Sequence, residues 1–251
     1  MTDELDRGIT ALDRIVEPIF YRTRPFPCSY LPGREETRVL TEISAEMAAG
    51  GFFEFLQHYG FRRSQRYLYR PACDGCTACI PVRIPVARFA PSRTMRKLHK
   101  LNHDLRASFA PARASAELFD LFERYQHQRH SDSDMALMSY EEFRLLIEES
   151  PVKTGLLQLR DEAGRLWACG LTDVGQDSLS AVYSFYEPDT PTRSLGTFLV
   201  QALVAEAVQR GLTYLYLGYW IEDCRKMSYK ARFSPLERFD GHRWVERAPE
   251  D

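Results

Sequence analysis

The 251-residue chain has little of what marks fibrous, disordered or membrane-spanning proteins. Glycine and proline number only 14 each and 44% of the residues are hydrophobic, which excludes collagen-like, low-complexity and largely disordered classes. No stretch approaches the roughly 18 consecutive apolar residues of a membrane helix, because Gln201 and Glu206 interrupt the best candidate, Phe198–Val208. Segment 1–13 carries four acids and no apolar run, which excludes a secretory signal. We therefore expect a globular, cytoplasmic protein with no membrane partner.

The chain also has almost no net charge, since 33 basic and 35 acidic residues give a value of −2. The charges are unevenly placed, however. Residues 62–106 hold 11 basic residues and two acidic ones, whereas the chain from residue 111 onward holds 16 basic and 23 acidic residues. Because salt screens charges more than about 8–10 Å apart, a distant acidic half does not cancel this block. The block predicts a surface for a polyanion such as a nucleic acid.

The strongest part of the basic block follows Ser92, a good helix N-cap. Its four cations fall at helical spacing on one face: Arg93, Arg96, Lys97 and Lys100. An ordinary solvated face is the alternative, but no acid is interleaved before Asp104, and like charges repel unless a polyanion neutralises them. We expect Arg62 and Arg63 to extend this surface.

Periodicity and turn residues predict the order of elements. Helices are expected over Ser44–Tyr59, Ser92–Leu105, Leu118–Gln128, Tyr140–Glu149 and Leu195–Arg210. Strands are expected at Tyr67–Tyr69, at Ile80–Val86 as an edge strand because of its prolines, and at Leu156–Arg160, Leu166–Asp173, Leu179–Tyr186 and Thr213–Trp220. A three-stranded meander, a helix and a returning strand indicate an α+β fold with an N-acetyltransferase-like (GNAT-like) mixed sheet. We expect a smaller cysteine-bearing subdomain over 1–110 and the GNAT-like catalytic subdomain over 111–251.

The start of the last helix could receive an anion. Arg193 and Gly196 stand where free backbone N–H groups and the positive helix end meet. A plain loop and cap explains this short pattern equally well.

Six cysteines are too few for a disulfide scaffold, but four of them suggest a metal site. Cys73, Cys76 and Cys79 form a C-x2-C-x2-C array, and Cys28 is a possible fourth ligand for zinc or an iron–sulfur cluster. Reduced thiols that pack a turn are the alternative, since the local array lacks a fourth cysteine.

Several long motifs, in order, resemble the bacterial members of the arginyl-tRNA–protein transferase family. They are Cys28-Ser-Tyr-Leu-Pro-Gly-Arg34, Gly60-Phe-Arg-Arg-Ser64, the cysteine array from Tyr69, Ser180-Ala-Val-Tyr-Ser-Phe-Tyr-Glu-Pro188, and the run from Tyr216 to Lys230. The resemblance implies a GNAT-like enzyme that uses aminoacyl-tRNA in place of acetyl-CoA. Its bacterial branch implies transfer of leucine from leucyl-tRNA to proteins that begin with Asp or Glu, which marks them for N-degron degradation.

The chemistry, aminolysis of an ester, suggests roles for individual residues and requires no cofactor. Tyrosine hydroxyls or backbone N–H groups of the two aromatic strands would meet the oxyanion, and the amine proton would leave through an acid or water. The catalytic candidates are Tyr183, Tyr186, Glu187 and Tyr219. The acceptor's carboxylate needs a cation, for which the candidates are Arg83, Arg225, Lys226 and Lys230. On a short helix, Lys226 and Lys230 would share one face.

Other functions remain open at this stage. Arginine could replace leucine as the donor amino acid. A CoA-dependent N-acyltransferase would use the same helix start, although Thr197 and Phe198 after Gly196 are bulky for a pyrophosphate cradle. A non-catalytic RNA-binding module with a zinc knuckle would explain the basic block and the cysteines, but not the tyrosine-rich strands.

Overall fold

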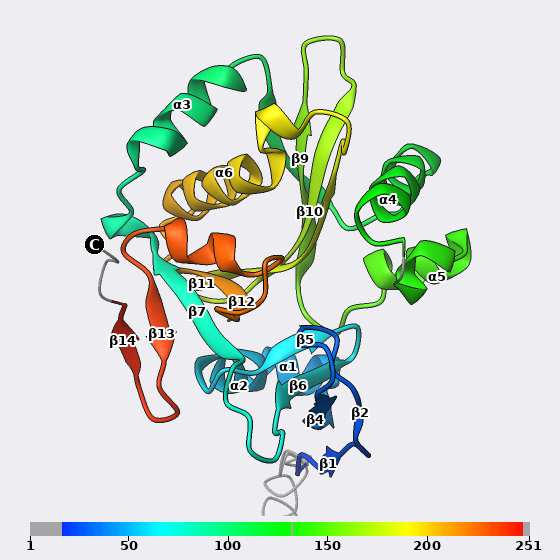
Figure 1. The fold of residues 1–251 in the computed structure, drawn as a ribbon, viewed down its shortest axis with the longest axis vertical. Coiled ribbons are helices and arrows are strands. Elements are labelled where there is room, and N and C mark those ends of the chain that lie inside the picture. Colours follow the sequence, from blue (N-terminus) through cyan, green and yellow to red (C-terminus); the bar gives the residue numbers. More distant parts are fainter. Residues whose placement is uncertain (1–16, 132, 248–251) are drawn as a thin grey trace, which may run out of the picture.

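The computed structural model describes residues 17–131 and 133–247. Segment 1–13, discussed above as a possible signal, lies outside this part of the chain. In these ranges an eight-stranded sheet, a four-stranded sheet, a two-stranded ribbon and six α-helices make up the fold (Figure 1). No helix in the described ranges is both long and apolar enough to cross a membrane.

The larger sheet has the strand order β14-β13-β7-β12-β11-β10-β9-β8. Its strands are β7 (Ile80–Pro85), β8 (Arg106–Pro111), β9 (Thr154–Arg160), β10 (Leu166–Val174), β11 (Ser178–Tyr186), β12 (Tyr214–Trp220), β13 (Glu237–Phe239) and β14 (Trp244–Glu246). Only the β11–β12 pair is parallel among these described neighbours. The meander, the helix and the returning strand confirm the predicted α+β class and GNAT-like core.

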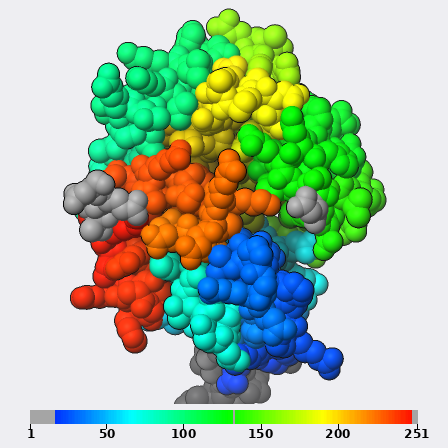
Figure 2. Space-filling model, in the orientation of Figure 1, coloured from blue at the N-terminus to red at the C-terminus, as the bar shows by residue number. Residues whose placement is uncertain are grey.

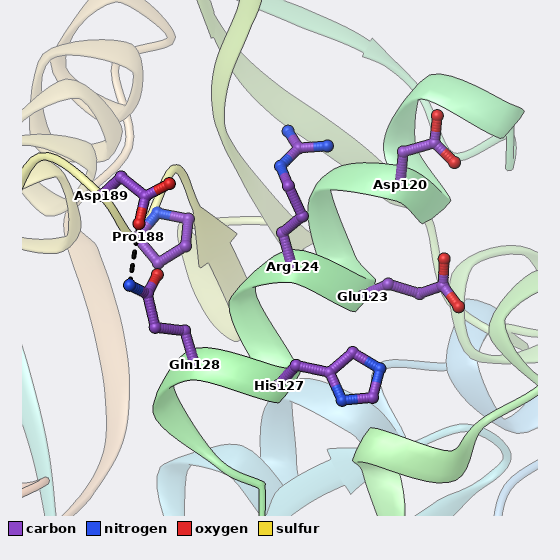
Figure 3. Close-up of a pocket in the computed structure, with 7 residues that line it drawn as sticks. All are labelled: Asp120, Glu123, Arg124, His127, Gln128, Pro188 and Asp189. Atoms are coloured by element: carbon purple, nitrogen blue, oxygen red, sulfur yellow. Dashed lines mark hydrogen bonds between the residues drawn. The ribbon is translucent and has the colours of Figure 1, made fainter.

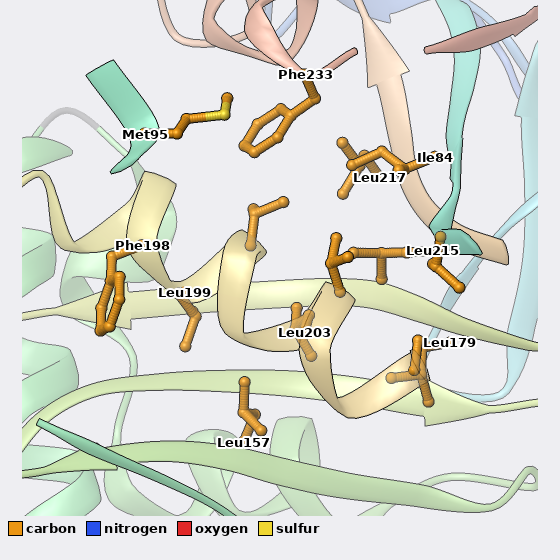
Figure 4. Close-up of a cluster of buried hydrophobic side chains, with 14 of the residues drawn as sticks. Ile84, Met95, Leu157, Leu179, Phe198, Leu199, Leu203, Leu215, Leu217 and Phe233 are labelled. Carbon is orange, nitrogen blue, oxygen red and sulfur yellow. The ribbon is translucent and has the colours of Figure 1, made fainter. Parts of the chain in front are cut away.

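Helices cover both faces of this sheet (Figure 1). One face carries α6 (Leu195–Gln209) and, beyond it, α3 (Arg93–Leu101); the other carries α4 (Ala116–Arg129) and α5 (Tyr140–Glu148). Alternation along β9 makes this possible, because Leu157 packs under α6 whereas its neighbour Leu156 packs under α4 (Figure 4).

The helix cap predicted at Ser92 is confirmed. Ser92 accepts a hydrogen bond from the N–H of Met95, and Ser139 forms a full capping box with Glu142. Helix α3 ends four residues earlier than predicted, because the amide of Asn102 binds the carbonyl groups of Leu98 and Arg193.

The prediction that Ile80–Val86 is an edge strand is wrong. Strand β7 lies between β12 and β13, and β13 pairs only with Val82 and Arg83. The two prolines lie outside that short pairing, so their missing N–H groups remove no hydrogen bond on the β13 side.

The N-terminal part forms a smaller sheet with the order β1-β4-β6-β5, covered by two short helices. The strands are β1 (Phe20–Arg22), β4 (Arg38–Glu42), β5 (Arg62–Ser64) and β6 (Tyr67–Pro71), with β2 (Phe26–Pro27) and β3 (Glu35–Glu36) forming a separate ribbon. The helices are α1 (Ala45–Ala49) and α2 (Phe52–His58). The predicted boundary at residue 110 falls inside β8, so residues 80–111 lie with the larger sheet. The division into two subdomains stays a prediction.

A buried ion pair joins the two sheets. The guanidinium of Arg63 in β5 forms two hydrogen bonds of 2.6 and 2.7 Å with the carboxylate of Asp173 in β10, and both side chains are at most 1% exposed. Thr154 donates a further bond to the same carboxylate, and Gln65 accepts one from the guanidinium. Each nitrogen of the Arg63 guanidinium and each oxygen of the Asp173 carboxylate therefore has at least one hydrogen-bond partner inside the protein.

Asp173→Asn should lower the free energy of unfolding by about 3–5 kcal/mol, because it leaves the guanidinium of Arg63 buried without its counter-charge. Urea unfolding measures this, with Glu141→Gln in the exposed pair with Arg144 as control, where at most about 0.5 kcal/mol is expected. The double variant Arg63→Met/Asp173→Leu should recover more than half of the loss. Equal losses in Asp173→Asn and the control would show that the pair does not hold the sheets together.

Candidate functional site

The larger sheet opens between its two parallel strands. Strands β11 and β12 pair only through Ser178–Ser180 and Tyr214–Tyr216, then diverge. The backbone edge of β11 beyond Ser180 is thus left without a neighbouring strand, and the polar groups of that edge need other partners. This opening is the candidate functional site.

Four tyrosines gather at the wide end of the opening and are called the tyrosine cluster: Tyr125 of α4, Tyr183 and Tyr186 of β11, and Tyr229 of the 3₁₀ helix Ser228–Arg232. The rings of Tyr125 and Tyr186 lie 4.8 Å apart, and the hydroxyl of Tyr183 contacts the amide of Gln126 at 2.6 Å. Burial raises the pKa of Tyr183 and of Tyr229 to about 12 and raises that of Tyr125 as well. The hydroxyl groups therefore remain protonated and can donate hydrogen bonds at neutral pH.

Tyr186 lies over the start of α6 because residue 196 is glycine. A Cβ atom at Gly196 would come within 2.9 Å of Cε1 of the Tyr186 ring. Ser194 begins the helix with φ of +45° and gives no side-chain cap. The close approach of Tyr186 and the helix start is thus one reason for glycine in the Ser194-Leu-Gly196 motif. Anion binding at Gly196 stays a prediction.

The prediction of a reacting hydroxyl at Tyr219 is wrong. This side chain has no exposed surface, and its hydroxyl lies 3.1 Å from the carbonyl oxygens of both Gly60 and Tyr69. Tyr219 therefore ties β12 to the smaller sheet and does not reach a substrate.

Glu187 has a structural role. Its Oε2 atom accepts hydrogen bonds from Arg124 of α4 and from Arg165 at the start of β10, and the residue is 5% exposed. The carboxylate joins the end of β11 to both elements. Its use as a proton acceptor stays a prediction.

Two arginines of the sequence-derived sites, Arg63 and Arg83, are buried. Arg63 forms a buried ion pair with Asp173, so its predicted contact with tRNA is wrong. Arg83 is 4% exposed, pairs with Glu237, contacts the hydroxyl of Tyr216 and stacks on Tyr214, so its predicted role in binding the acceptor carboxylate is wrong too. Both predictions failed because each carboxylate partner lies more than 100 residues away in the sequence.

Arg62 enters the opening between β11 and β12 from β5. Its Nη2 atom donates to the carbonyl oxygens of Val182 at 3.0 Å and Ala181 at 3.4 Å, on the free edge of β11. Gly218, with φ of +74°, leaves the necessary room, since a Cβ there would lie 2.4 Å from the Cζ atom of Arg62. Arg62 is half-buried in the opening and is not part of the α3 surface, so its predicted place on that surface is wrong.

The remaining acceptor candidates lie on the segment after β12, which fills the middle of the face shown in Figure 2, in orange. Arg225 and Lys226 are exposed there, whereas Lys230 is 4% exposed. The 3₁₀ helix begins at Ser228, after Lys226, so the predicted shared face of Lys226 and Lys230 is wrong. The Nζ atom of Lys230 donates to the carbonyl of Tyr219 at 2.6 Å, and burial lowers the pKa of Lys230 well below its usual value.

The four cations of α3, Arg93, Arg96, Lys97 and Lys100, are all exposed. None of them has an ion pair within the described ranges, although Arg96 bonds the carbonyl of Pro91. Arg193 instead holds the end of α3 by pairing with Asp104 and bonding Asn102, while its guanidinium lies over Trp167. Arg193 thus positions the basic helix, and a direct contact with tRNA stays a prediction.

The cysteines do not assemble a metal site in the part of the chain that is described. No group of three or more metal-ligating side chains converges there. The thiols accept from protein donors: Cys28 from the N–H of Leu31, Cys73 from that of Thr37, and Cys76 from Arg34. Cys28, Cys76 and Cys79 pack around Ile221 and Cys224, and burial raises the pKa of Cys79 to about 12. Metal binding by Cys28, Cys73, Cys76 and Cys79 stays a prediction, as does the alternative of reduced thiols that pack a turn.

A separate cavity of about 620 Å³ lies between α4 and the loop after β11 (Figure 3). Its rim includes Asp120, Glu123 and Asp189, with Gln128 bonded to Asp189 across it. Arg124 belongs to the same lining but pairs with Glu187. The excess of carboxylates makes this side of the molecule unfavourable for a phosphate backbone.

Sequence reasoning missed Tyr125, Tyr229 and His130 at the site. Tyr125 continues the apolar stripe Leu118, Leu121, Phe122 of α4, so it was indistinguishable from a core residue. His130 follows the helix and its Nε2 lies 3.3 Å from the Tyr125 hydroxyl. The signal in the sequence that could have identified Tyr125 is a hydroxyl-bearing residue at the end of an apolar helix stripe.

Comparison with known proteins gives matches to both halves of the chain. Residues 26–97 match "Arginine-tRNA-protein transferase, N terminus", and residues 117–240 match "Arginine-tRNA-protein transferase, C terminus". A protein of Paramagnetospirillum magneticum named aspartate/glutamate leucyltransferase is 50% identical over 92% of this chain and 95% of its own length. A protein of the same name from Azorhizobium caulinodans is 46% identical over 90% of this chain and 95% of its own length.

Among solved structures, L-PGS from Bacillus licheniformis aligns with a TM-score of 0.45 at 14% identity, over 72% of this chain and 51% of that one.

Tyr219→Phe should lower the free energy of unfolding by about 1–2 kcal/mol, because the carbonyl groups of Gly60 and Tyr69 lose their shared buried donor. Tyr140→Phe is the matched control: its ring is exposed, and a change within about 0.5 kcal/mol is expected. Urea unfolding of both variants measures the difference. Wild-type stability of Tyr219→Phe would contradict the structural role given to this hydroxyl.

Proposed function

The chain belongs to the arginine-tRNA–protein transferase family, and we propose that it transfers leucine from leucyl-tRNA to the N-terminal α-amine of proteins that begin with Asp or Glu. One observation carries the choice of donor and acceptor: relatives named aspartate/glutamate leucyltransferase match nearly their full length and this chain at up to 50% identity. The leucyl mark would send the acceptor to N-degron degradation. We place this activity in the cytoplasm, where charged tRNA is found.

The opening between β11 and β12 supports a donor other than an acyl-CoA. An extended, amide-bearing arm would bind by pairing with the free edge of β11. Arg62 already occupies the carbonyl groups of Ala181 and Val182 on that edge, and only about 10 Å³ remains between Arg62, Ser180, Tyr216 and Gly218. This argues against the CoA-dependent alternative.

The tRNA would lie along α3. Helices α3 and α4 lie on opposite sides of the molecule (Figure 1). The four cations of α3 are exposed, and the carboxylates of the open cavity line it beside α4. A polyanion is therefore attracted to one side of the site and repelled from the other. The acceptor protein would then approach from the side beside α4.

The reaction forms an amide at the expense of an ester. The acceptor's α-amine, partly neutral at pH 7, attacks the carbonyl carbon of the leucyl ester, and the carbonyl oxygen becomes negatively charged. The hydroxyls of Tyr186 and Tyr229 in the tyrosine cluster would donate to that oxygen, and burial keeps the Tyr229 hydroxyl protonated by raising its pKa to about 12. Collapse of the intermediate breaks the bond to the ribose oxygen, which takes up a proton, and the proton lost by the amine leaves through Glu187 or water. No metal is needed for these steps.

The decisive assay measures labelled leucine transferred from charged tRNA to an Asp-initiated peptide. Leucyl-, arginyl- and phenylalanyl-tRNA are compared in parallel, with acetyl-CoA as a control donor. We expect transfer of leucine, with arginine and acetyl transfer at least tenfold slower. If arginine were transferred faster than leucine, the donor would be arginyl-tRNA instead of leucyl-tRNA. If only acetyl transfer were seen, the proposed function would be wrong.

Binding of leucyl-tRNA should weaken steeply with salt. Arg96→Gln/Lys97→Gln should reduce the slope of log K against log salt by about 1.4–1.8, because each contact with a phosphate contributes about 0.7–0.9. The control Arg144→Gln/Lys153→Gln removes the same charge from exposed residues near the opposite end of the larger sheet. Salt-independent binding, or an equal reduction in both variants, would contradict a tRNA surface on α3.

A further inference from the structure

Arg62 differs from the other inward-pointing arginines in having no acid beside it. Arg63 pairs with Asp173 and Arg83 pairs with Glu237, whereas no carboxylate of the described residues lies within ion-pair distance of Arg62. Glu36, a buried carboxylate of the same N-terminal region, is engaged by Arg38. A half-buried guanidinium without a counter-charge keeps an unmatched positive charge, so it favours an anionic ligand.

The groups around Arg62 do not supply that charge. They are the tyrosines 30, 69, 219 and 229, and burial raises the pKa of Tyr30 and of Tyr229 to about 12, which keeps both hydroxyls neutral. The guanidinium lies 5.7 Å from the centre of the Tyr219 ring. Its two described hydrogen bonds both use Nη2, so the Nε and Nη1 donors are left for a ligand.

A second nitrogen without a carboxylate stands next to Arg62. Lys230 donates to the carbonyl of Tyr219 and contacts Met227, and its titration responds to the charge of Arg62. Tyr219 thus holds Arg62 on its ring and Lys230 on its carbonyl group. The N-terminal sheet and the segment after β12 bring two basic groups to one place, with no internal anion between them.

We propose that Arg62, supported by Lys230, binds the side-chain carboxylate of the acceptor's N-terminal Asp or Glu. This inference rests on the proposed function and names the recognition element of the same site. A guanidinium N–H donates a charge-assisted hydrogen bond to a carboxylate oxygen, which is shorter and stronger than a bond between neutral groups.

The available space favours a carboxylate over a tRNA phosphate. About 10 Å³ remains beside Arg62 in the narrow end of the opening, which is the room of roughly one water molecule. One carboxylate oxygen can take that place. A phosphodiester, with four oxygens around phosphorus and ribose on both sides, cannot.

The position also suits the reaction. Tyr229 of the tyrosine cluster lies within electrostatic range of both Arg62 and Tyr186. In Asp and Glu only three or four bonds separate the carboxylate carbon from the α-nitrogen. A residue held by Arg62 would therefore present its amine toward the tyrosine cluster.

The test compares Asp- and Asn-initiated peptides of otherwise identical sequence, because the ratio of their kcat/KM values cancels any general loss of folded enzyme. Wild type should prefer Asp by at least tenfold. Arg62→Met should reduce this ratio about 10- to 100-fold, mainly through KM for the Asp peptide, and Arg62→Lys should restore part of it. Arg70→Met, which removes another arginine of the same small sheet that lies over Phe61, should leave the ratio unchanged.

A ratio that stays at its wild-type value in Arg62→Met would overturn the proposal, as would a wild-type enzyme that does not distinguish Asp from Asn. Equal losses for both peptides together with weaker leucyl-tRNA binding would assign Arg62 to the tRNA instead. If Arg62→Met does not fold by circular dichroism, Lys230→Met is expected to lower the same ratio about 3- to 10-fold, and no change would count against the site.

Calorimetric titration of the wild-type chain with the two peptides separates this inference from the proposed function. Stronger binding of the Asp peptide without leucine transfer from any tRNA would retain the carboxylate site and reject the function. Leucine transfer with equal binding of both peptides would retain the proposed function and reject the carboxylate site.

Discussion

The parting of β11 and β12 sets the main constraint on this molecule. Parallel strands that pair through only three residues leave carbonyl groups exposed inside the protein, where each unpaired one costs about 1–3 kcal/mol. Arg62 satisfies two of them, Gly218 makes room for it, and β5 carries it into the opening. The small sheet is therefore as much a part of the site as the large one. Its attachment through Arg63 and Asp173 follows from the same need, because Arg62 must be held in register.

Opposite charges are kept apart around this opening. The cations of α3 have no ion pairs among the described residues, and the hydrogen bonds of Arg193 to Asp104 and Asn102 fix that helix against α6. On the other side, the carboxylates near α4 surround an open cavity. A chain with almost no net charge therefore carries two separate local fields, a basic one along α3 and an acidic one beside α4.

Local features were predictable from the sequence, and long-range partners were not. The caps at Ser92 and Ser139, the meander and the period of α6 depend on neighbours within a few residues. The interior position of β7 depends on β13, and the burial of Arg63 and Arg83 depends on Asp173 and Glu237. In a lone sequence, a buried arginine and a solvated one look the same. The adjacent pair Arg62 and Arg63 shows the limit most clearly, since one serves the opening and the other the attachment.

The position of β7 has a consequence for how the chain is made. β7 is flanked by β12 and β13, which are synthesised about 130 and 150 residues later. Until then the apolar side chains of Val82 and Ile84 have no neighbouring strand, and the edges of β7 are open to other chains. An interior strand of the large sheet thus stays unpaired for about half of the protein's synthesis, so the yield in the cell should depend on chaperones or on rapid completion of translation.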